Sequence, residues 1–244
     1  GRSLLPFLRA HLLQGATANL PRIRAYDAGA REWRSLDALP APRRQAPRSY
    51  VGLYAAADRT LTWTRPRERA GFDSYRSDPQ SPVPFATRPI ELLGDTWEPW
   101  IAADQSPFAS RPDVLTYRTA PLEAPLTVRG FPEVELHAST TGTDADWVVK
   151  LLDVVPADPA VPGAREYLLP VAMEIFRGRY RSGFGTPRAL RSSVVQPFYF
   201  DLPLVHHTFA RGHRIAIQVQ SSWFPLYDRN PQTFVRSIFD ARAS

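Results

Sequence analysis

Residues 213–222, HRIAIQVQSS, alternate between two kinds of side chain, and this alternation decides the fold. Ile215, Ile217 and Val219 occupy every second position, with Gln218 and Gln220 between and after them. Successive side chains of a β-strand point to opposite faces, so a period of about two residues is typical of a strand with one face in the core. We therefore predict a half-buried antiparallel strand here.

Residues 146–155, DWVVKLLDVV, are apolar on both faces of an extended chain, which predicts a central strand covered on each side. Further strands are expected at 126–130 (LTVRG), 133–139 (EVELHAS) and 197–203 (PFYFDLP). The 25 prolines argue against long helices. Short strands, turn-rich loops and a long connection over 85–111 favour a mainly β fold, with a jelly-roll β-sandwich of galactose-binding-like type as the leading topology.

The first 45 residues follow a different pattern. Leu5, Leu8 and Leu12 recur at helical spacing, which predicts one amphipathic helix. The segment 22–40 then contains an Asp-Ala-Gly turn between two apolar stretches, which indicates a hairpin or a strand with an extended return. The stretch 40–48 is rich in proline and arginine and has no apolar period. We place a domain boundary there, with one unit at 1–45 and a second at 46–244.

The composition excludes several classes of function. The net charge is +6, but the basic residues are scattered among acids, and all are arginine except Lys150, so nucleic-acid binding is not favoured. The absence of cysteine removes disulfides, thiolate catalysis and cysteine-based zinc sites. Apolar runs are far too short to span a bilayer, so we expect a soluble globular protein. The start, GRSLLPFLRAHLLQG, lacks an initiator methionine and a signal peptide and looks like a start inside a longer chain.

Ser221 and Ser222 are the most conspicuous candidate nucleophiles. A serine hydrolase places its nucleophile on a strained strand-to-helix turn between small residues, as in G-x-S-x-G. Here the bulky Trp223 and Phe224 follow at once, and Pro225 opposes a helix start. We expect both hydroxyls to satisfy loop amides, with Asp228 and Arg229 tying the following loop into a rigid corner.

The histidines and acids lack the spacing of a metal site. His206 and His207 are adjacent, so on an extended chain they point to opposite faces, and His137 and His213 have no second ligand at a suitable spacing. We interpret them as hydrogen-bonded structural residues. The acid pairs Asp144/Asp146 and Asp153/Asp158 do not form a calcium-loop pattern, so capping and turn roles are favoured over a weak calcium site. No catalytic residue, metal ligand or cofactor is predicted within the chain.

Several separated motifs resemble those of one enzyme family. RPDVLTYRTAPLEAPLTVRG, DADWVVKLLDV and GHRIAIQVQSSWFPLYDRNPQT are similar, in this order, to the C-terminal domain of the cocaine esterase (CocE/NonD) and X-Pro dipeptidyl-peptidase family. GFDSYRSDPQSPVPF, WEPW, ADQSPFASRPDVL, LLPVAMEIFRGRYR and SSWFPLYDRNPQTFV resemble its α-amino-acid ester hydrolase branch, which includes glutaryl-7-aminocephalosporanic acid acylases. The resemblance extends from about Leu4 to Phe239.

The resemblance implies that residues 1–45 are the end of an α/β-hydrolase domain and that 46–244 form the jelly roll packed against it. The serine, aspartate and histidine of the family lie upstream, so this chain alone is expected to be inactive. The implied parent is a serine hydrolase acting on α-amino-acid esters or β-lactam-type amides. Alternatives are an X-Pro dipeptidyl peptidase, a cocaine-esterase-like acyl esterase, or a stand-alone carbohydrate-binding jelly roll. The expected partners are the catalytic domain, a small ester or amide substrate, and further copies of the chain. Nucleic acid and membrane are not expected as partners. The compartment stays open, with a periplasmic or secreted location favoured over a cytoplasmic one.

Part of the jelly roll is expected to close one side of the substrate pocket. A long, stiff, apolar loop suits this role because excluding water strengthens the electrostatics inside the pocket. The segment 85–100, FATRPIELLGDTWEPW, fits best. The lining candidates are Phe85, Ile90, Leu92, Trp97 and Trp100. Equally, Trp97 and Trp100 could fill the interface between domains, or form a sugar platform with Trp223.

Overall fold

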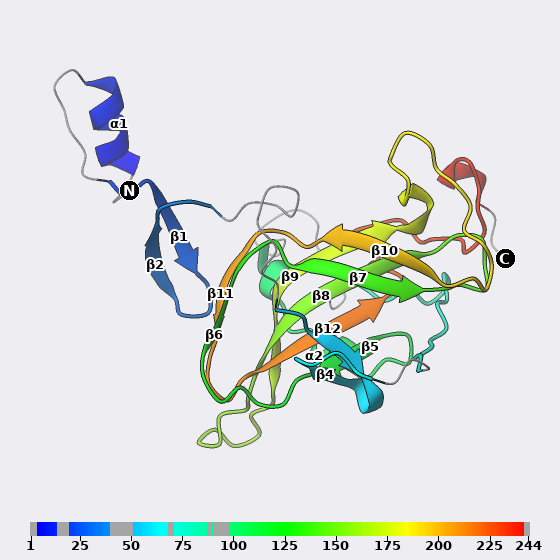
Figure 1. Cartoon of the computed structure of the whole chain (residues 1–244), viewed down its shortest axis with the longest axis horizontal. Helices are drawn as coiled ribbons and strands as arrows, with labels where there is room; N and C mark the ends of the chain where they lie inside the picture. Colours follow the sequence, from blue (N-terminus) through cyan, green and yellow to red (C-terminus); the bar gives the residue numbers. More distant parts are fainter. Residues whose placement is uncertain are drawn as a thin grey trace.

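The structure is a computed structural model that describes residues 4–13, 20–39, 51–67, 71–86, 89 and 98–241. Helices are few and short: α1 (Leu4–Leu12), α2 (Ser106–Ala109), and the 3-10 helices η1 (Ala57–Arg59), η2 (Glu98–Ala102), η3 (Gly178–Tyr180) and η4 (Ile238–Asp240). The helix predicted near the start is confirmed as α1. The remaining elements are strands, which form a β-sandwich (Figure 1).

A six-stranded sheet forms the larger layer. Its order is β3 (Tyr54–Ala56), β4 (Thr60–Thr62), β5 (Leu115–Arg118), β12 (Arg214–Gln220), β8 (Asp146–Val155) and β9 (Tyr167–Arg177). The neighbours pair antiparallel except β4 and β5, which are parallel. The strands predicted at 146–155 and 213–222 are therefore β8 and β12, and they pair with each other at the centre of the sheet.

The second layer is a bent two-stranded ribbon. β6 (Leu126–Gly130) pairs antiparallel with β11 (Val205–Phe209), and β7 (Glu133–Ala138) pairs antiparallel with β10 (Gln196–Asp201). Since β7 follows β6 and β11 follows β10 along the chain, the two pairs continue one another. Gly130 lies at the bend with φ 138°, a backbone conformation that favours glycine.

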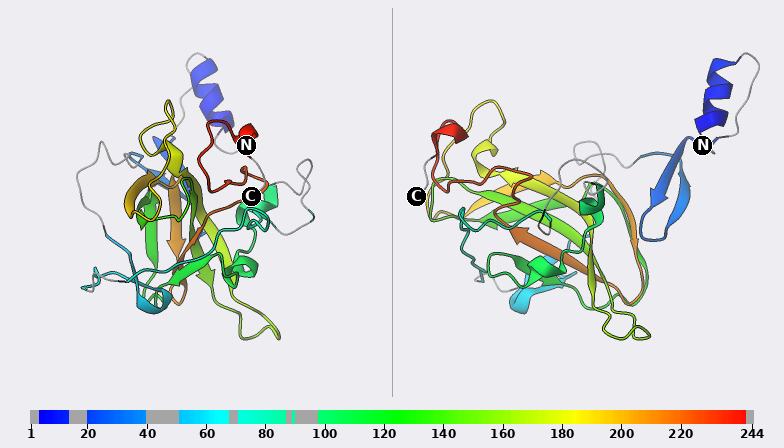
Figure 2. Two further views of the ribbon diagram at one scale, coloured as in Figure 1. Left: turned by 90° about the vertical axis from the view of Figure 1, so that its right-hand side faces the viewer. Right: turned by 180° about the vertical axis from the view of Figure 1, so that it is seen from behind.

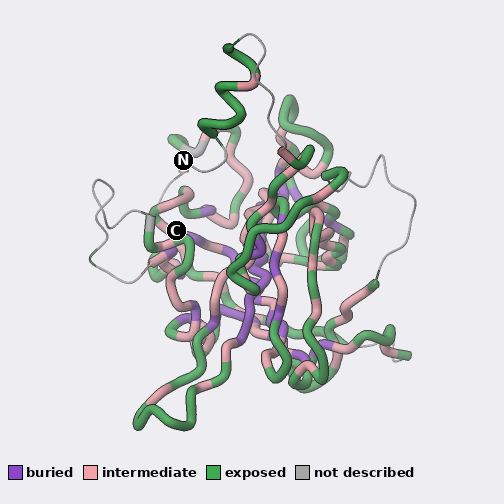
Figure 3. Tube along the Cα trace, turned by 90° about the vertical axis from the view of Figure 1, so that its left-hand side faces the viewer, coloured by how far each residue is buried: buried purple, intermediate pink, exposed green. Residues whose placement is uncertain are grey.

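The main core lies between these layers. Trp147 and Phe198 pack with ring centroids 4.2 Å apart, and Phe176 continues the aromatic stack to Phe200 at 5.0 Å. In Figure 3 the buried segments run along the central strands. Every residue of β8 from Asp146 to Val154 is buried, which confirms the prediction of a strand covered on both sides.

The outer face of the six-stranded sheet is also covered, by segments that are mostly irregular. Residues 98–114 and 223–227 cross this face. In the two views of Figure 2 they lie on the other side of the six-stranded sheet from the layer formed by β6, β7, β10 and β11. Gln218 and Gln220, which point outward from β12, are 0% exposed. The prediction that this strand is only half buried is therefore wrong, because its polar face meets these covering segments instead of solvent.

The hairpin predicted near the start consists of β1 (Ile23–Asp27) and β2 (Glu32–Leu36). It packs beside β11: the Ala28 N–H donates to His206 O over 3.1 Å, and the Thr208 N–H donates to Asp27 Oδ1 over 2.9 Å. By contrast, α1 buries none of its residues and stands apart from the sandwich (Figures 1 and 3). Within the described residues, no helix has the length and apolar character needed to cross a membrane.

Candidate functional site

The two serines hold loops together. Ser221 Oγ lies 2.6 Å from Tyr75 Oη, and Ser222 Oγ accepts the Val83 N–H at 2.8 Å. Next to this contact, Phe224 and residues 83–85 exchange backbone hydrogen bonds of 3.0 Å, which joins the strand exit to a distant segment. Ser222 therefore satisfies a loop amide as expected, whereas Ser221 bonds to a tyrosine hydroxyl instead of an amide.

The buried histidines bind carboxylates but no serine. His207 Nε2 and His213 Nδ1 each lie 2.8 Å from a different oxygen of Asp153, which is 2% exposed. His206 lies 3.8 Å from Asp27, and there the hydroxyl of Thr208 donates to the carboxylate rather than to the imidazole. In a nucleophilic triad the serine hydroxyl donates a hydrogen bond to the histidine imidazole. The described residues therefore form no such relay.

The acids singled out in the sequence mostly form ion pairs. Asp144 pairs with Arg179, and Asp146 accepts from Arg177 at 3.2 Å. Burial raises the pKa of Asp146 to about 6, against the opposing attraction of Arg177. Only Asp158 has the simple turn role expected, accepting the Ala160 N–H at 2.9 Å. Among the residues that the structure describes, no group of three or more histidine, aspartate or glutamate side chains is arranged so that it could hold a metal ion.

The corner at 223–232 is stiffened by polar contacts. Arg229 donates to Pro79 O at 3.2 Å and lies over the Phe224 ring at 5.4 Å. Asn230 accepts the Gln232 N–H at 2.8 Å and donates to Asp146 at 3.0 Å. The rigid corner predicted from this stretch is therefore present, although Arg229 binds backbone and an aromatic ring rather than an acid.

An aromatic cluster lies on the outer face of the six-stranded sheet. Phe85 and Trp100 meet edge to face at 5.4 Å, and Trp100 meets Trp223 edge to face at 5.7 Å. We call these three residues the aromatic wall. Phe85 is 2% exposed and Trp223 is 3% exposed, whereas Trp100 is half-buried. Ile90, Leu92 and Trp97 lie outside the described residues, so the lining role of all five candidates stays a prediction.

The burial of Trp223 bears on the carbohydrate-binding alternative. A sugar platform needs an exposed ring face, and Trp223 is enclosed by Trp100 and by Tyr227, whose ring is stacked on it at 5.9 Å. Trp223 is therefore not available as part of such a platform.

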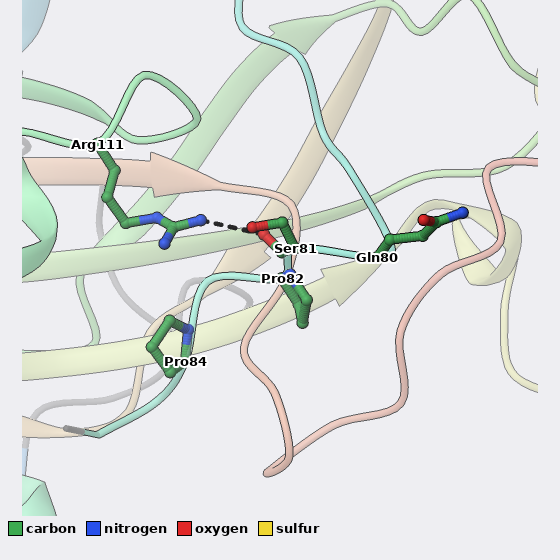
Figure 4. A pocket seen from close by; sticks show the side chains of 5 residues that line it. All are labelled: Gln80, Ser81, Pro82, Pro84 and Arg111. Atoms are coloured by element: carbon green, nitrogen blue, oxygen red, sulfur yellow. Dashed lines mark hydrogen bonds between the residues drawn. The ribbon is translucent and has the colours of Figure 1, made fainter. Parts of the chain in front are cut away.

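A shallow depression lies beside the aromatic wall. Gln80, Ser81, Pro82, Pro84 and Arg111 line a volume of about 280 Å³ (Figure 4). Arg111 donates to Ser81 O at 3.0 Å and makes two bonds of 2.8 Å to Asp113, which raise its pKa further. Its one guanidinium is already paired, and the other lining side chains are an amide, two prolines and the Ser81 hydroxyl, which has no histidine or carboxylate beside it in the lining, so the depression offers no activated nucleophile.

One polar group beneath the aromatic wall escaped the sequence reasoning. Lys150 of β8 is 0% exposed, and burial lowers its pKa to about 7. Its Nζ donates to Gln105 Oε1 at 2.7 Å and lies 5.4 Å from the Phe108 ring and 5.6 Å from the Trp223 ring. The signal was present in the sequence: the single lysine of the chain lies between the apolar runs 147–149 and 151–152 of one strand.

Taken together, these observations define a β-sandwich in which the hydroxyls, imidazoles and carboxylates described above bond to one another and to the backbone, and the described residues contain no serine–histidine–acid relay. Residues 14–239 match the family described as the X-Pro dipeptidyl-peptidase C-terminal non-catalytic domain. The chain belongs to this family, which confirms the resemblance drawn from its motifs.

Relatives and solved structures agree with this assignment. A cocaine esterase from Rhodococcus sp. (strain MB1 Bresler) is 32% identical over 223 residues, covering 89% of this chain and 37% of the esterase. A solved α-amino acid ester hydrolase is 45% identical, with a TM-score of 0.92 over 98% of this chain and 40% of its own. An aminopeptidase from a marine sediment Thaumarchaeota archaeon is 44% identical, with a TM-score of 0.91 over 99% of this chain and 39% of its own. The chain thus spans less than half the length of these proteins.

Proposed function

We propose that this chain is the non-catalytic sandwich domain of a larger serine hydrolase that cleaves α-amino-acid esters or β-lactam-type amides. In this proposal the reacting serine, histidine and aspartate belong to a separate α/β-hydrolase domain of the same polypeptide. The sandwich stabilises that domain and forms one wall of its substrate pocket.

One observation carries the proposal: the chain is 45% identical to the α-amino acid ester hydrolase and nearly superimposable on it, yet covers only 40% of it. The contacts described above support the same division of labour. Ser221 and Ser222 are used by Tyr75 and Val83, and the imidazoles bind carboxylates within the fold.

Helix α1 supports a docking role. Its apolar side chains are unusually exposed: Leu4 62%, Leu5 51%, Phe7 47%, Leu8 39% and Leu12 73%. An amphipathic helix normally buries its apolar stripe against another element, and the described residues provide none for α1. We take the occupant to be the catalytic domain, because the family relatives carry more than half of their length outside the matched region.

The experiment compares the isolated chain with the full-length polypeptide on an activated α-amino-acid ester. The expected result is turnover by the full-length polypeptide, abolished by substituting its upstream serine, and no turnover by the isolated chain. Turnover by the isolated chain that disappears in Ser222→Ala would overturn the proposal.

The aminopeptidase likeness makes a peptide substrate the main alternative, because its identity to this chain, 44%, is almost the same. Both substrate classes present a free N-terminal α-ammonium group, which lies beside the scissile carbonyl in an α-amino-acid ester and one residue away from it in an X-Pro dipeptide amide. They differ in the leaving group, so one preparation of the full-length polypeptide should be assayed with an amino-acid ester and with an X-Pro dipeptide amide. A higher kcat/KM for the dipeptide amide would replace the ester hydrolase assignment with the peptidase one.

A further inference from the structure

Lys150 is an exceptional residue in this protein. Of 30 lysine and arginine residues it is the single lysine, and it is wholly enclosed rather than on the surface. Arginine cannot lose its charge in a protein, whereas a buried lysine can, so the two residues are not equivalent at this position. An isolated buried amine is costly unless it makes compensating contacts.

The contacts of Lys150 join the sheet to its cover. Along the sheet it pairs in register with Gln218 of β12 and Met173 of β9. Above the sheet its Nζ donates to Gln105, which precedes α2, and faces the rings of Phe108 and Trp223. Phe108 packs in a cluster with Val83 and Val114, and Trp223 packs in a second cluster with Phe85 and Val148. The ammonium therefore lies where the two apolar clusters of the cover meet.

The remaining polar atoms near Lys150 match an ammonium group. An ammonium carries three donors, and Gln105 accepts one. The neighbouring Gln218 donates to Gln105 O at 3.4 Å, while its Oε1, buried in the structure, has no hydrogen-bond partner. These acceptors and the two ring faces offset part of the cost of enclosing the charge, but burial outweighs them and lowers the pKa.

Other charged groups on these elements act elsewhere. Asp104 accepts the N–H groups of Ser106 and Leu168 at 2.9 Å, and Arg111 and Asp113 bind each other. On β9, Glu174 acts on Tyr227, whose pKa burial and this carboxylate raise. Burial is the one cause of the lowered pKa of Lys150, so its protonation responds to the cover itself.

We propose that Lys150 is a positioning residue whose neutral amine, bonded to Gln105, lets the α2 turn and Trp223 close against the sheet, so that protonation loosens this cover and displaces the aromatic wall. The effect on the wall concerns this chain alone. The consequence for substrate binding rests on the proposed function, in which Phe85 and Trp100 line the pocket.

The first test uses hydrogen–deuterium exchange of the isolated chain at about pH 6, where the ammonium is populated. Lys150→Met removes the charge at similar length. We expect exchange of the amides of Phe85, Phe224 and Tyr227 to fall at least roughly fivefold, with no fall in β7 and β10. The control Leu151→Met changes the inner face of the same strand and should leave the cover unchanged.

The unsubstituted chain provides a second readout that does not depend on a variant. Because Lys150 is the single lysine, ¹⁵N-lysine labelling gives one side-chain signal to follow. Raising the pH from about 6 to about 9 should deprotonate this amine and, after correction for intrinsic rates, decrease exchange in the cover relative to β7 and β10, because the neutral amine favours the closed cover. Equal protection of the cover at both pH values, or in Lys150→Met, overturns the positioning role.

The full-length polypeptide tests the functional half. At about pH 6, Lys150→Met should lower KM severalfold while kcat changes by less than about twofold, because the closed wall contacts substrate without entering the chemistry. Altered exchange with an unchanged KM would refute the link to the pocket while leaving the catalytic assignment intact. Loss of ester hydrolysis by the unsubstituted polypeptide would instead refute the proposed function.

Discussion

Asp144 and Arg179 form an ion pair sealed inside one end of the sandwich. Asp144 is 0% exposed and Arg179 is 6% exposed, and Arg179 Nε donates to Asp144 Oδ2 at 2.8 Å. Asp144 lies just before β8 and Arg179 just after β9, so the pair joins the two longest strands. The guanidinium also lies 5.1 Å from the Phe234 ring, so the C-terminal segment packs against the same ion pair.

Removing one partner of this pair should be severely destabilising. Asp144→Ala leaves the Arg179 guanidinium buried without a counter-charge, which typically costs about 3–5 kcal/mol. Chemical denaturation of the isolated chain measures the loss. As a control, Glu166→Ala breaks the pair with Arg118, whose side chains are 44% and 34% exposed, and should cost less than about 1 kcal/mol. Comparable losses for the two variants would contradict the interpretation.

The strands that the sequence predicted share a clear period or a continuous apolar run. β8 and β12 carry such patterns, because each residue faces either the opposite layer or the cover. The longest strand, β9, was not predicted. Pro170 interrupts its pattern, and the structure tolerates this proline because β9 lies at the edge of the sheet, with a register shift opposite Leu151 and Leu152.

The cover could not be predicted from local pattern. Gln218 and Gln220 carry a pattern typical of a solvated face, but irregular segments about a hundred residues away along the chain bury them, as the contact from Gln218 to Gln105 shows. The same limit applies to the aromatic wall, where the role of Trp223 depends on its packing against Trp100. The serines were interpreted correctly because the bulky residues after Ser222 argue locally against a nucleophile turn.

The β1–β2 hairpin should depend on Asp27 for its attachment to the sandwich. Burial alone would raise the pKa of this carboxylate. The hydrogen bonds from Ala30 and Thr208 lower the pKa by more than burial raises it, so the net shift is downward. Asp27→Ala leaves the Thr208 N–H without its acceptor and is expected to cost roughly 1–3 kcal/mol, concentrated in hairpin docking. Hydrogen exchange of residues 23–36 measures this local loss.

Gly29 provides an independent check on the same contact. A Cβ added there would lie 2.0 Å from Thr208 O, so Gly29→Ala should also release the hairpin. A matched substitution at Gly71, where an added Cβ meets nothing within 4 Å, should have no such effect.

The lowered pKa of Asp27 also predicts a pH dependence of hairpin docking. Since a depressed carboxylate pKa gives stability that is lost as pH falls, docking should weaken below about pH 4. Full protection of the hairpin in Asp27→Ala would show that the contact is dispensable.

Ser222→Ala should leave the activity of the full-length polypeptide nearly unchanged while lowering stability. The hydroxyl accepts the Val83 N–H at 2.8 Å, and its removal leaves that donor without a partner, which costs about 1–3 kcal/mol. Ester hydrolysis and thermal unfolding are measured on one preparation. A loss of kcat of about a thousandfold, as expected for a nucleophile, would refute the structural role.

The stability of the chain should increase as pH rises from about 7 to about 10, because of Lys150. In the unfolded chain this amine titrates at its ordinary pKa of 10.5, whereas in the folded chain burial lowers the pKa to about 7. Between these values the unfolded state binds more protons, so raising the pH favours folding. The gap corresponds to roughly 5 kcal/mol as an upper bound. Below about pH 7 both states are protonated and the cost of burying the charge is fully present.

Lys150→Met isolates this contribution, since methionine cannot titrate and fills a similar volume. The variant should be more stable than the unsubstituted chain near pH 7, with a gain smaller than the upper bound because Gln105 loses its donor. The difference in free energy of unfolding between the variant and the unsubstituted chain should shrink as pH rises toward 10, which a series of urea denaturations measures. Parallel stability curves for the two chains across this range would mean that Lys150 keeps an ordinary pKa in the fold, and that the cover does not exclude solvent from it.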